Sequence, residues 1–293
     1  MAFVTGWKKD PRSTKDFIYK PKIVALPDHV DFIALLPAVA DQNGNGACTG
    51  FTFAALLGFW AKKLGIVLMP QDMEWFSQWW IYNGARYIEG TLPFDEGAYP
   101  RDCLDWLMEK GGLPYHFWPY TEKFDKTSPP TKFDPEAAKF PLAAYYRVTG
   151  SFDGVCNAMA SGHCVALGTP WFDKWMDPGS SGKLAVITED DEVVGGHAYL
   201  AVGYDRIAGH LICLNSWGKE WGENGFCYLP AQAFPVFNRV GGYDAYYIEV
   251  AWGPQPKPDQ PCMMTKAFLA ASNKAAKILG SKRRFHSTKE GKV

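Results

Sequence analysis

Residues 41–65 read DQNGNGACTGFTFAALLGFWAKKLG, a polar loop broken by glycines that leads into an apolar run. Apolar residues recur at helical spacing from Phe51 to Ala61, and Gly65 follows as a stop signal. The pattern therefore predicts a helix that begins at Cys48. Unpaired N–H groups at a helix N-terminus lower the pKa of a thiol, so Cys48 occupies a position suited to a nucleophile.

The rest of the chain separates into a helical half and a strand-rich half. Two further helical patterns follow, at 73–88 and 101–110. From about residue 145, short β-branched and aromatic runs alternate with turns, which predicts antiparallel strands at 165–167, 198–204, 211–214, 225–229 and 246–250. Helices first and strands second indicates an α+β fold whose two halves face each other.

Composition excludes several classes of protein. The 293 residues are 47% hydrophobic and 21% charged, with 30 Lys+Arg against 31 Asp+Glu, which is typical of a globular chain and not of a disordered or coiled-coil one. The longest apolar stretch, 51–61, is shorter than the roughly 18–20 residues that span a bilayer, so we expect no membrane helix. Lys and Asp interrupt residues 1–16, so we expect no signal peptide and a cytoplasmic location.

The number and spacing of the cysteines argue against a disulfide-stabilised fold and against a zinc site. There are seven, an odd number, with no C-x-x-C pair and no Cys/His spacing typical of zinc. Free thiols in a reducing compartment are the simplest interpretation. We therefore expect neither a metal nor a cofactor.

Two segments of the strand-rich half carry a histidine and an asparagine at positions suited to a general base and to a residue that orients it. His197 follows two glycines and begins an apolar strand, where it can serve as a general base. Asn215 leaves the strand at 211–214, where its side-chain oxygen can orient an imidazole, and Trp217 can shield that contact from water.

Gln42 lies six residues before Cys48, in a loop that can fold back. Its amide can then donate to an oxyanion beside the Cys48 N–H. Each of these residues alone is more often structural. Together they supply a nucleophile, a base, an orienting residue and an oxyanion donor, the groups that acyl transfer by a cysteine requires.

These motifs resemble the papain family (C1) of cysteine peptidases, and its bacterial-type branch in particular. Residues 41–49 resemble that branch's D-Q-x-x-x-G-x-C-T loop, and residues 195–198 resemble its histidine strand. Residues 215–226 read NSWGKEWGENGF, close to the family run N-S-W-G-x-x-W-G-x-x-G-[YF], which is the most specific match. Residues 97–100 and 118–120 resemble landmarks of the family's helical domain.

The resemblance implies a papain-like fold in which a helical N-terminal subdomain (about 41–144) packs against an antiparallel β-barrel-like C-terminal subdomain (145–252), with the active-site cleft between them. It divides the chain into an N-terminal extension (1–26), a catalytic domain (27–252), and a Pro-rich linker with a basic tail (253–293). It also implies hydrolysis of peptide bonds in peptide or protein substrates through a covalent thioester.

In this resemblance Cys48, His197, Asn215 and Gln42 are the catalytic residues, and Trp217 supports them. Gly97, Ala98 and Gly196 are expected to contact the substrate backbone. Ala98 departs from the family pattern, since it replaces the second glycine of a pair. Another departure is the segment before Pro27, which is shorter than the family's usual inhibitory prodomain, so any latency must arise differently.

The balanced total charge hides a segregation. After residue 253, nine Lys and Arg stand against Asp259 and Glu290, a net charge of +7 that leaves −8 on residues 1–253. We expect the tail 254–293 to dock on its own acidic domain or on an acidic partner. Nucleic acid is not the expected partner, because the tail has few aromatic residues for stacking.

Two other functions remain compatible with the same residues. The thioester could pass its acyl group to an amine, or the site could deamidate a side chain. A papain-like protein can also retain the scaffold for binding or structure without turnover, for example as a component of a virion.

Overall fold

The structure is a computed structural model that describes residues 5–14, 16–20, 25–68, 75–148 and 151–253. Its compact unit spans Met1–Trp252. The linker and basic tail, with the docking expected for them, lie outside the described residues. Within the described part of the chain, no helix is both long and apolar enough to cross a membrane.

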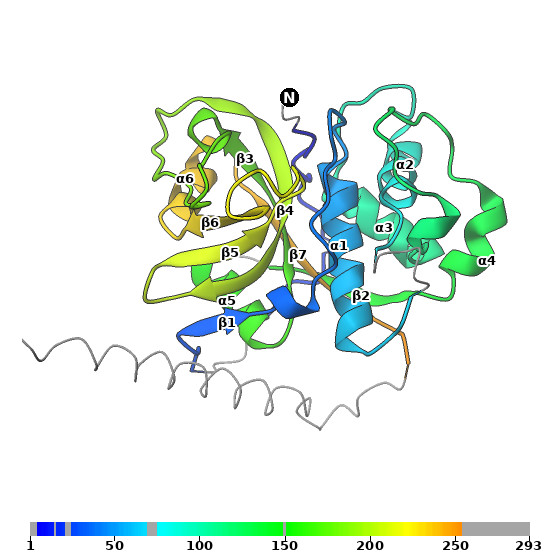
Figure 1. The fold of residues 1–293 in the computed structure, drawn as a ribbon, viewed down its shortest axis with the longest axis horizontal. Helices are drawn as coiled ribbons and strands as arrows, with labels where there is room; N and C mark the ends of the chain where they lie inside the picture. Colours follow the sequence, from blue (N-terminus) through cyan, green and yellow to red (C-terminus); the bar gives the residue numbers. More distant parts are fainter. Residues whose placement is uncertain (1–4, 15, 21–24, 69–74, 149–150, 254–293) are drawn as a thin grey trace, which may run out of the picture. The chain divides into compact units, whose positions relative to one another are not determined.

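Helix α1 (Cys48–Lys63) begins at the predicted residue and lies at the centre of the molecule. Almost all its side chains are buried, because α2 (Gln78–Glu89) and α3 (Pro100–Lys110) cover one side and the sheet covers the other (Figure 1). The helix ends before Gly65, whose φ of 67° is left-handed and stops it. This burial on all sides holds the N-terminus of α1, and hence Cys48, at a defined place beside the sheet.

The second predicted helix begins later than its pattern indicated. Residues 73 and 74 lie outside the described part of the chain, and α2 starts at Gln78 because the Ser77 side chain caps it by accepting a hydrogen bond from Trp80 N. The third helix starts one residue before its predicted range, with Pro100 in the first turn. The pattern missed the short helices α4 (Asp134–Ala137), α5 (Phe152–Ala160) and α6 (Ala233–Val240), which contain too few residues to display a period.

The strands form one antiparallel sheet in the order β2-β7-β3-β4-β5-β6, and β1 pairs with β4. Their ranges are β1 (His29–Asp31), β2 (Leu142–Arg147), β3 (Val165–Phe172), β4 (Val193–Asp205), β5 (His210–Leu214), β6 (Phe226–Pro230) and β7 (Asp244–Val250). The α+β prediction is confirmed. Among the described strands the sheet is an open path with β2 and β6 at its ends, so it is not a closed barrel.

Strands β3 and β4 are longer than their patterns indicated. They continue pairing through Thr169↔His197 and Trp171↔Gly195 to Phe172↔Val193. Cys213 faces Cys227 across β5 and β6, and both are free thiols, like the other described cysteines.

A buried arginine holds the loop after α2. Arg86 donates through Nη1 to Leu92 O (2.8 Å) and Phe94 O (3.0 Å), and through Nη2 to Asp125 O (2.8 Å) and to Asn83 Oδ1. These bonds place the neighbouring residue Asp95 where it accepts from Gly46 N at 2.9 Å. The core of the helical half is thereby connected to the loop that leads into Cys48.

The N-terminal residues are extended and lie across both halves. Their lack of periodicity predicts this conformation, and residues 5–14 and 16–20 contain no helix. Trp7 forms a parallel bridge with Ala98 in the helical half, and Ile18 forms one with Arg147 of β2.

Candidate active site

Cys48 is the first residue of α1 and is fully buried. Its thiol receives hydrogen bonds from the backbone of Ala198, the residue after His197, and from the backbone of Gly6 and Thr49. Burial outweighs these bonds and raises the pKa of the Cys48 thiol to about 12. The thiol is therefore protonated in this closed arrangement, despite its place at a helix N-terminus.

The sheet brings His197 and Asn215 together, as their sequence positions predict. His197 Nε2 lies 2.7 Å from Asn215 Oδ1, which also accepts from Ser216 N at 2.8 Å. A backbone N–H can only donate, so the atom that it contacts must be the amide oxygen, and His197 Nε2 must carry the ring proton. His197 Nδ1 is then the basic nitrogen, and it is buried without a hydrogen-bond partner.

Burial also sets the charge of the imidazole. Desolvation lowers the pKa of His197 to about 4, although the bond to Asn215 opposes the shift. A neutral thiol and a neutral imidazole therefore occupy the closed site.

Aromatic rings enclose the histidine. The Trp217 ring centroid lies 4.5 Å from that of His197. Trp171, on β3, lies 4.8 Å away in an edge-on arrangement and was not predicted. No local motif marks Trp171, because it reaches the site only through the cross-strand register of β3 and β4.

Gln42 is fully buried and hydrogen-bonds to Ser216, the residue after Asn215. Its backbone N–H donates to Ser216 O at 2.8 Å, and its Oε1 accepts from Ser216 Oγ at 2.6 Å. Tyr120 OH donates to Gln42 O, and Gln42 Nε2 donates to Asn45 O at 2.7 Å. Sequence reasoning missed the contributions of Ser216 and Tyr120, although both lie inside the quoted motifs.

Of the three residues expected to contact substrate backbone, Ala98 and Gly196 already bond to main chain, and Gly97 N donates to Tyr82 OH at 3.1 Å. Ala98 N donates to Gly6 O at 2.9 Å, and Ala98 O accepts from Lys8 N at 3.2 Å. Gly196 O accepts from Trp7 N at 2.8 Å. Gly97 has a φ of 78°, and a Cβ there would lie 1.9 Å from Gly6 O. We call residues 5–10 the covering segment, because they pass over Cys48 between these groups.

The structure thus brings all the predicted site residues together. Cys48 and Gln42 come from the helical half, while His197, Asn215 and Trp217 come from the sheet and the loop that follows β5. Among the described residues, no group of three or more His, Cys, Asp or Glu side chains could hold a metal ion.

The chain is similar to known proteins in sequence and in fold. A family model described as papain family cysteine protease matches residues 96–234, which include His197 and Asn215 but not Cys48. The crystal structure of xylellain, a cysteine protease from Xylella fastidiosa, is similar with a TM-score of 0.74 and 29% identity, over 84% of this chain and 95% of that one.

Two curated relatives extend the sequence match. A peptidase C1-like protein of Acanthamoeba polyphaga mimivirus, itself uncharacterized, is 28% identical over 71% of this chain and 67% of its own length. Chymopapain from Carica papaya is 25% identical over 80% of this chain and 63% of its own length. The matches thus span about two thirds of the length of these relatives. From its motifs, its fold and these relatives, we conclude that the chain belongs to the papain family of cysteine proteases.

Proposed function

We propose that the chain hydrolyses peptide bonds through a covalent thioester on Cys48, with His197 as base and acid, Asn215 as the residue that orients it, and Gln42 as an oxyanion donor. The contact between His197 Nε2 and Asn215 Oδ1, 2.7 Å long, is the observation that carries this proposal. It leaves Nδ1 as the nitrogen that takes a proton.

The first half of the reaction forms the thioester. His197 Nδ1 removes the proton from Cys48 Sγ, and the thiolate attacks the carbonyl carbon of the scissile bond. The carbonyl oxygen becomes an anion that accepts from Gln42 Nε2 and from the Cys48 N–H at the start of α1, where the helix dipole adds to the stabilisation. The imidazolium then gives its proton to the leaving amine, and the C–N bond breaks.

The second half releases the acid. Neutral His197 takes a proton from water, the hydroxide attacks the thioester carbonyl, and the Cys48 thiolate leaves. Trp217 and Trp171 keep bulk water away from the bond between His197 and Asn215, so the ring keeps its orientation through both steps. We propose extended peptides as substrates, because Ala98 and Gly196 offer main-chain groups on the two walls of the site.

The test is incubation of a peptide library with the full chain, with Cys48→Ala as reference and mass spectrometry of the products. A Gly6→Ala variant is included, because a Cβ at Gly6 would lie 1.9 Å from Gly46 O and should displace the covering segment. Backbone cuts that disappear in Cys48→Ala are the expected result. New isopeptide links or one-dalton mass shifts would instead indicate acyl transfer or deamidation, and cleavage by Cys48→Ala would refute the proposal.

A further inference from the structure

A single carboxylate connects two segments of the proposed site. We call residues 42–47, which lead into Cys48, the nucleophile loop. Asp95 Oδ2 accepts from the backbone N–H of Gly46 in this loop at 2.9 Å, and Asp95 Oδ1 accepts from Tyr82 OH at 2.6 Å. Asp95 therefore holds the nucleophile loop to helix α2, on which Tyr82 lies.

Tyr82 extends this connection to the residues proposed to bind substrate. Its OH accepts from Gly97 N at 3.1 Å. Gly97 precedes Ala98, and we call residues 97–98 the substrate wall. Burial and the Asp95 carboxylate raise the pKa of Tyr82, so its hydroxyl keeps the proton that it donates. One chain of hydrogen bonds therefore runs from the nucleophile loop to the substrate wall.

We propose that Asp95 is a positioning residue, which keeps the nucleophile loop and the substrate wall at a fixed separation so that a bound peptide presents its carbonyl carbon to Cys48. Asp95 acts through Gly46 and Tyr82 and takes no part in the bond making. The inference deepens the proposed function and rests on it.

The groups around Gly46 show how closely the two segments are packed. A Cβ on Gly46 would lie 3.1 Å from Asp95 Oδ1 and 3.4 Å from both Gly97 N and Tyr82 OH. Three polar groups from three parts of the chain therefore converge on one glycine. A small displacement of the loop would change its distance to all three at once.

The connection is fixed to the core, although Asp95 itself is an exposed residue. Tyr82 is fully buried, and Gly46 and Gly97 are buried as well. The Arg86 guanidinium lies 4.3 Å from the centroid of the Tyr82 ring and donates to the carbonyl oxygen of the residue before Asp95 at 3.0 Å. Because buried donors that lose an acceptor carry a free-energy cost, removing the carboxylate should be felt at both ends of the chain of bonds.

The charge of the carboxylate does not explain its place in the site. Burial is the largest cause of the raised pKa of the Cys48 thiol, and the Asp95 carboxylate acts in the same direction. Asp95 thus disfavours the thiolate and cannot serve to activate Cys48. Its contribution is expected to come from its two hydrogen bonds.

The experiment measures kcat and KM for cleavage of a peptide amide. Every variant is made in the full chain that carries Gly6→Ala, because the covering segment bonds to Ala98 in the parent chain. Tyr82→Phe breaks only the link to the substrate wall, so KM should rise about tenfold while kcat stays within about twofold. Asp95→Ala breaks both links, so kcat should also fall, by about 10- to 100-fold.

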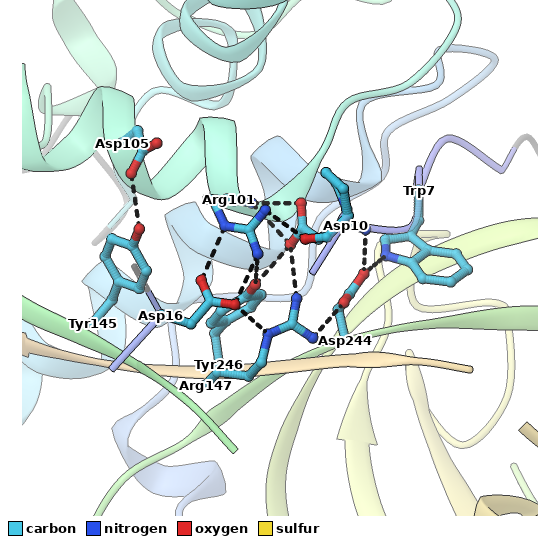
Figure 2. A network of polar contacts seen from close by, with 10 residues as sticks. Trp7, Asp10, Asp16, Arg101, Asp105, Tyr145, Arg147, Asp244 and Tyr246 are labelled. Carbon is cyan, nitrogen blue, oxygen red and sulfur yellow. Dashed lines mark hydrogen bonds and ion pairs between the residues drawn. The ribbon is translucent and has the colours of Figure 1, made fainter. Parts of the chain in front are cut away.

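The matched control is Asp105→Ala. Asp105 is also exposed and also accepts from a tyrosine hydroxyl, at 2.9 Å, but its partner Tyr145 lies on β2 (Figure 2) and not in the nucleophile loop or the substrate wall. It should leave kcat and KM unchanged. Asp95→Asn keeps one acceptor oxygen and the shape of the side chain, so its kcat should lie between those of the reference chain and Asp95→Ala.

A double variant tests whether the two residues act along one path. Asp95→Ala combined with Tyr82→Phe should raise KM by less than the product of the two single effects, because both residues belong to the same chain of hydrogen bonds. Effects that multiply, or an unchanged KM in Tyr82→Phe, would overturn the proposal. A loss of kcat in Asp105→Ala as large as that in Asp95→Ala would also overturn it, since general destabilisation would then account for both.

Alkylation of Cys48 by iodoacetamide, measured by mass spectrometry of its peptide, separates this proposal from the peptidase. Asp95→Ala releases Gly46 N and removes a negative charge, so alkylation should accelerate about tenfold over the reference chain, equal to about 1.4 kcal/mol. Asp105→Ala should not change the rate. If no chain cleaves peptide, the proposed function fails, and faster alkylation in Asp95→Ala alone still supports the restraint on the nucleophile loop. An unchanged rate in Asp95→Ala refutes the positioning role, whatever the cleavage.

Discussion

Ser216→Ala tests whether a buried hydroxyl positions the oxyanion donor. Ser216 Oγ lies 2.6 Å from Gln42 Oε1, and the two residues are 6% and 0% exposed. Removing this donor deprives a buried acceptor of a hydrogen bond, which costs about 1–3 kcal/mol. If the lost hydrogen bond leaves the Gln42 amide misoriented in the transition state, the same free-energy cost lowers kcat/KM by about 5- to 150-fold.

The assay is steady-state cleavage of a peptide amide, with every variant made in the Gly6→Ala chain so that the covering segment does not obscure the rates. Gln42→Ala sets the upper limit, since losing one oxyanion donor costs about 10²- to 10³-fold in kcat. Ser161→Ala is the matched control, because its exposed hydroxyl bonds Asn157 O far from these residues in the sequence. It should leave kcat/KM unchanged.

A double variant provides the decisive result. If Ser216 acts only by holding Gln42, then Gln42→Ala combined with Ser216→Ala should be no slower than Gln42→Ala alone. Losses that multiply would show that Ser216 acts independently, and a fully active Ser216→Ala would show that the hydroxyl does not position the amide. Either outcome refutes the reasoning.

Three further outcomes are expected. Asn215→Ala should lower kcat by about 10²-fold, because a misoriented His197 is displaced by about 1 Å or more from its productive position; a normal kcat would contradict that role. Asp10 belongs to the covering segment, and burial and the neighbouring Asp244 raise its pKa to about 7. Between about pH 6 and 8 its carboxyl loses a proton and is repelled by Asp244, so alkylation of Cys48 by iodoacetamide should rise more steeply in the parent chain than in Asp10→Asn, which has no proton to lose. Parallel profiles would count against the titration of Asp10. Arg86→Met should lower the free energy of unfolding in urea by about 3 kcal/mol, because it removes a buried guanidinium that donates to three part-buried carbonyls. Met at exposed Arg12 should have no effect.

The sequence predicted those elements whose position is set by residues close together in the chain. The helix that begins at Cys48 and the strand that holds His197 were predictable because apolar spacing and glycine stops act over a few residues. The position of Asn215 directly after a strand was readable for the same reason. The start of α2 was misjudged, because a cap at Ser77 decided it and an apolar pattern does not report caps.

The sequence by itself determined the α+β class, the family and the residue types available for chemistry. Tertiary structure alone decided that Trp171 encloses the histidine and that the N-terminal residues cover the thiol. The bond from Trp7 to Asp244 joins residues 237 positions apart, and it depends on a recess that exists only when β3 and β4 lie side by side. Such contacts leave no periodic trace in the chain, because they arise from packing between elements and not from the preferences of either element.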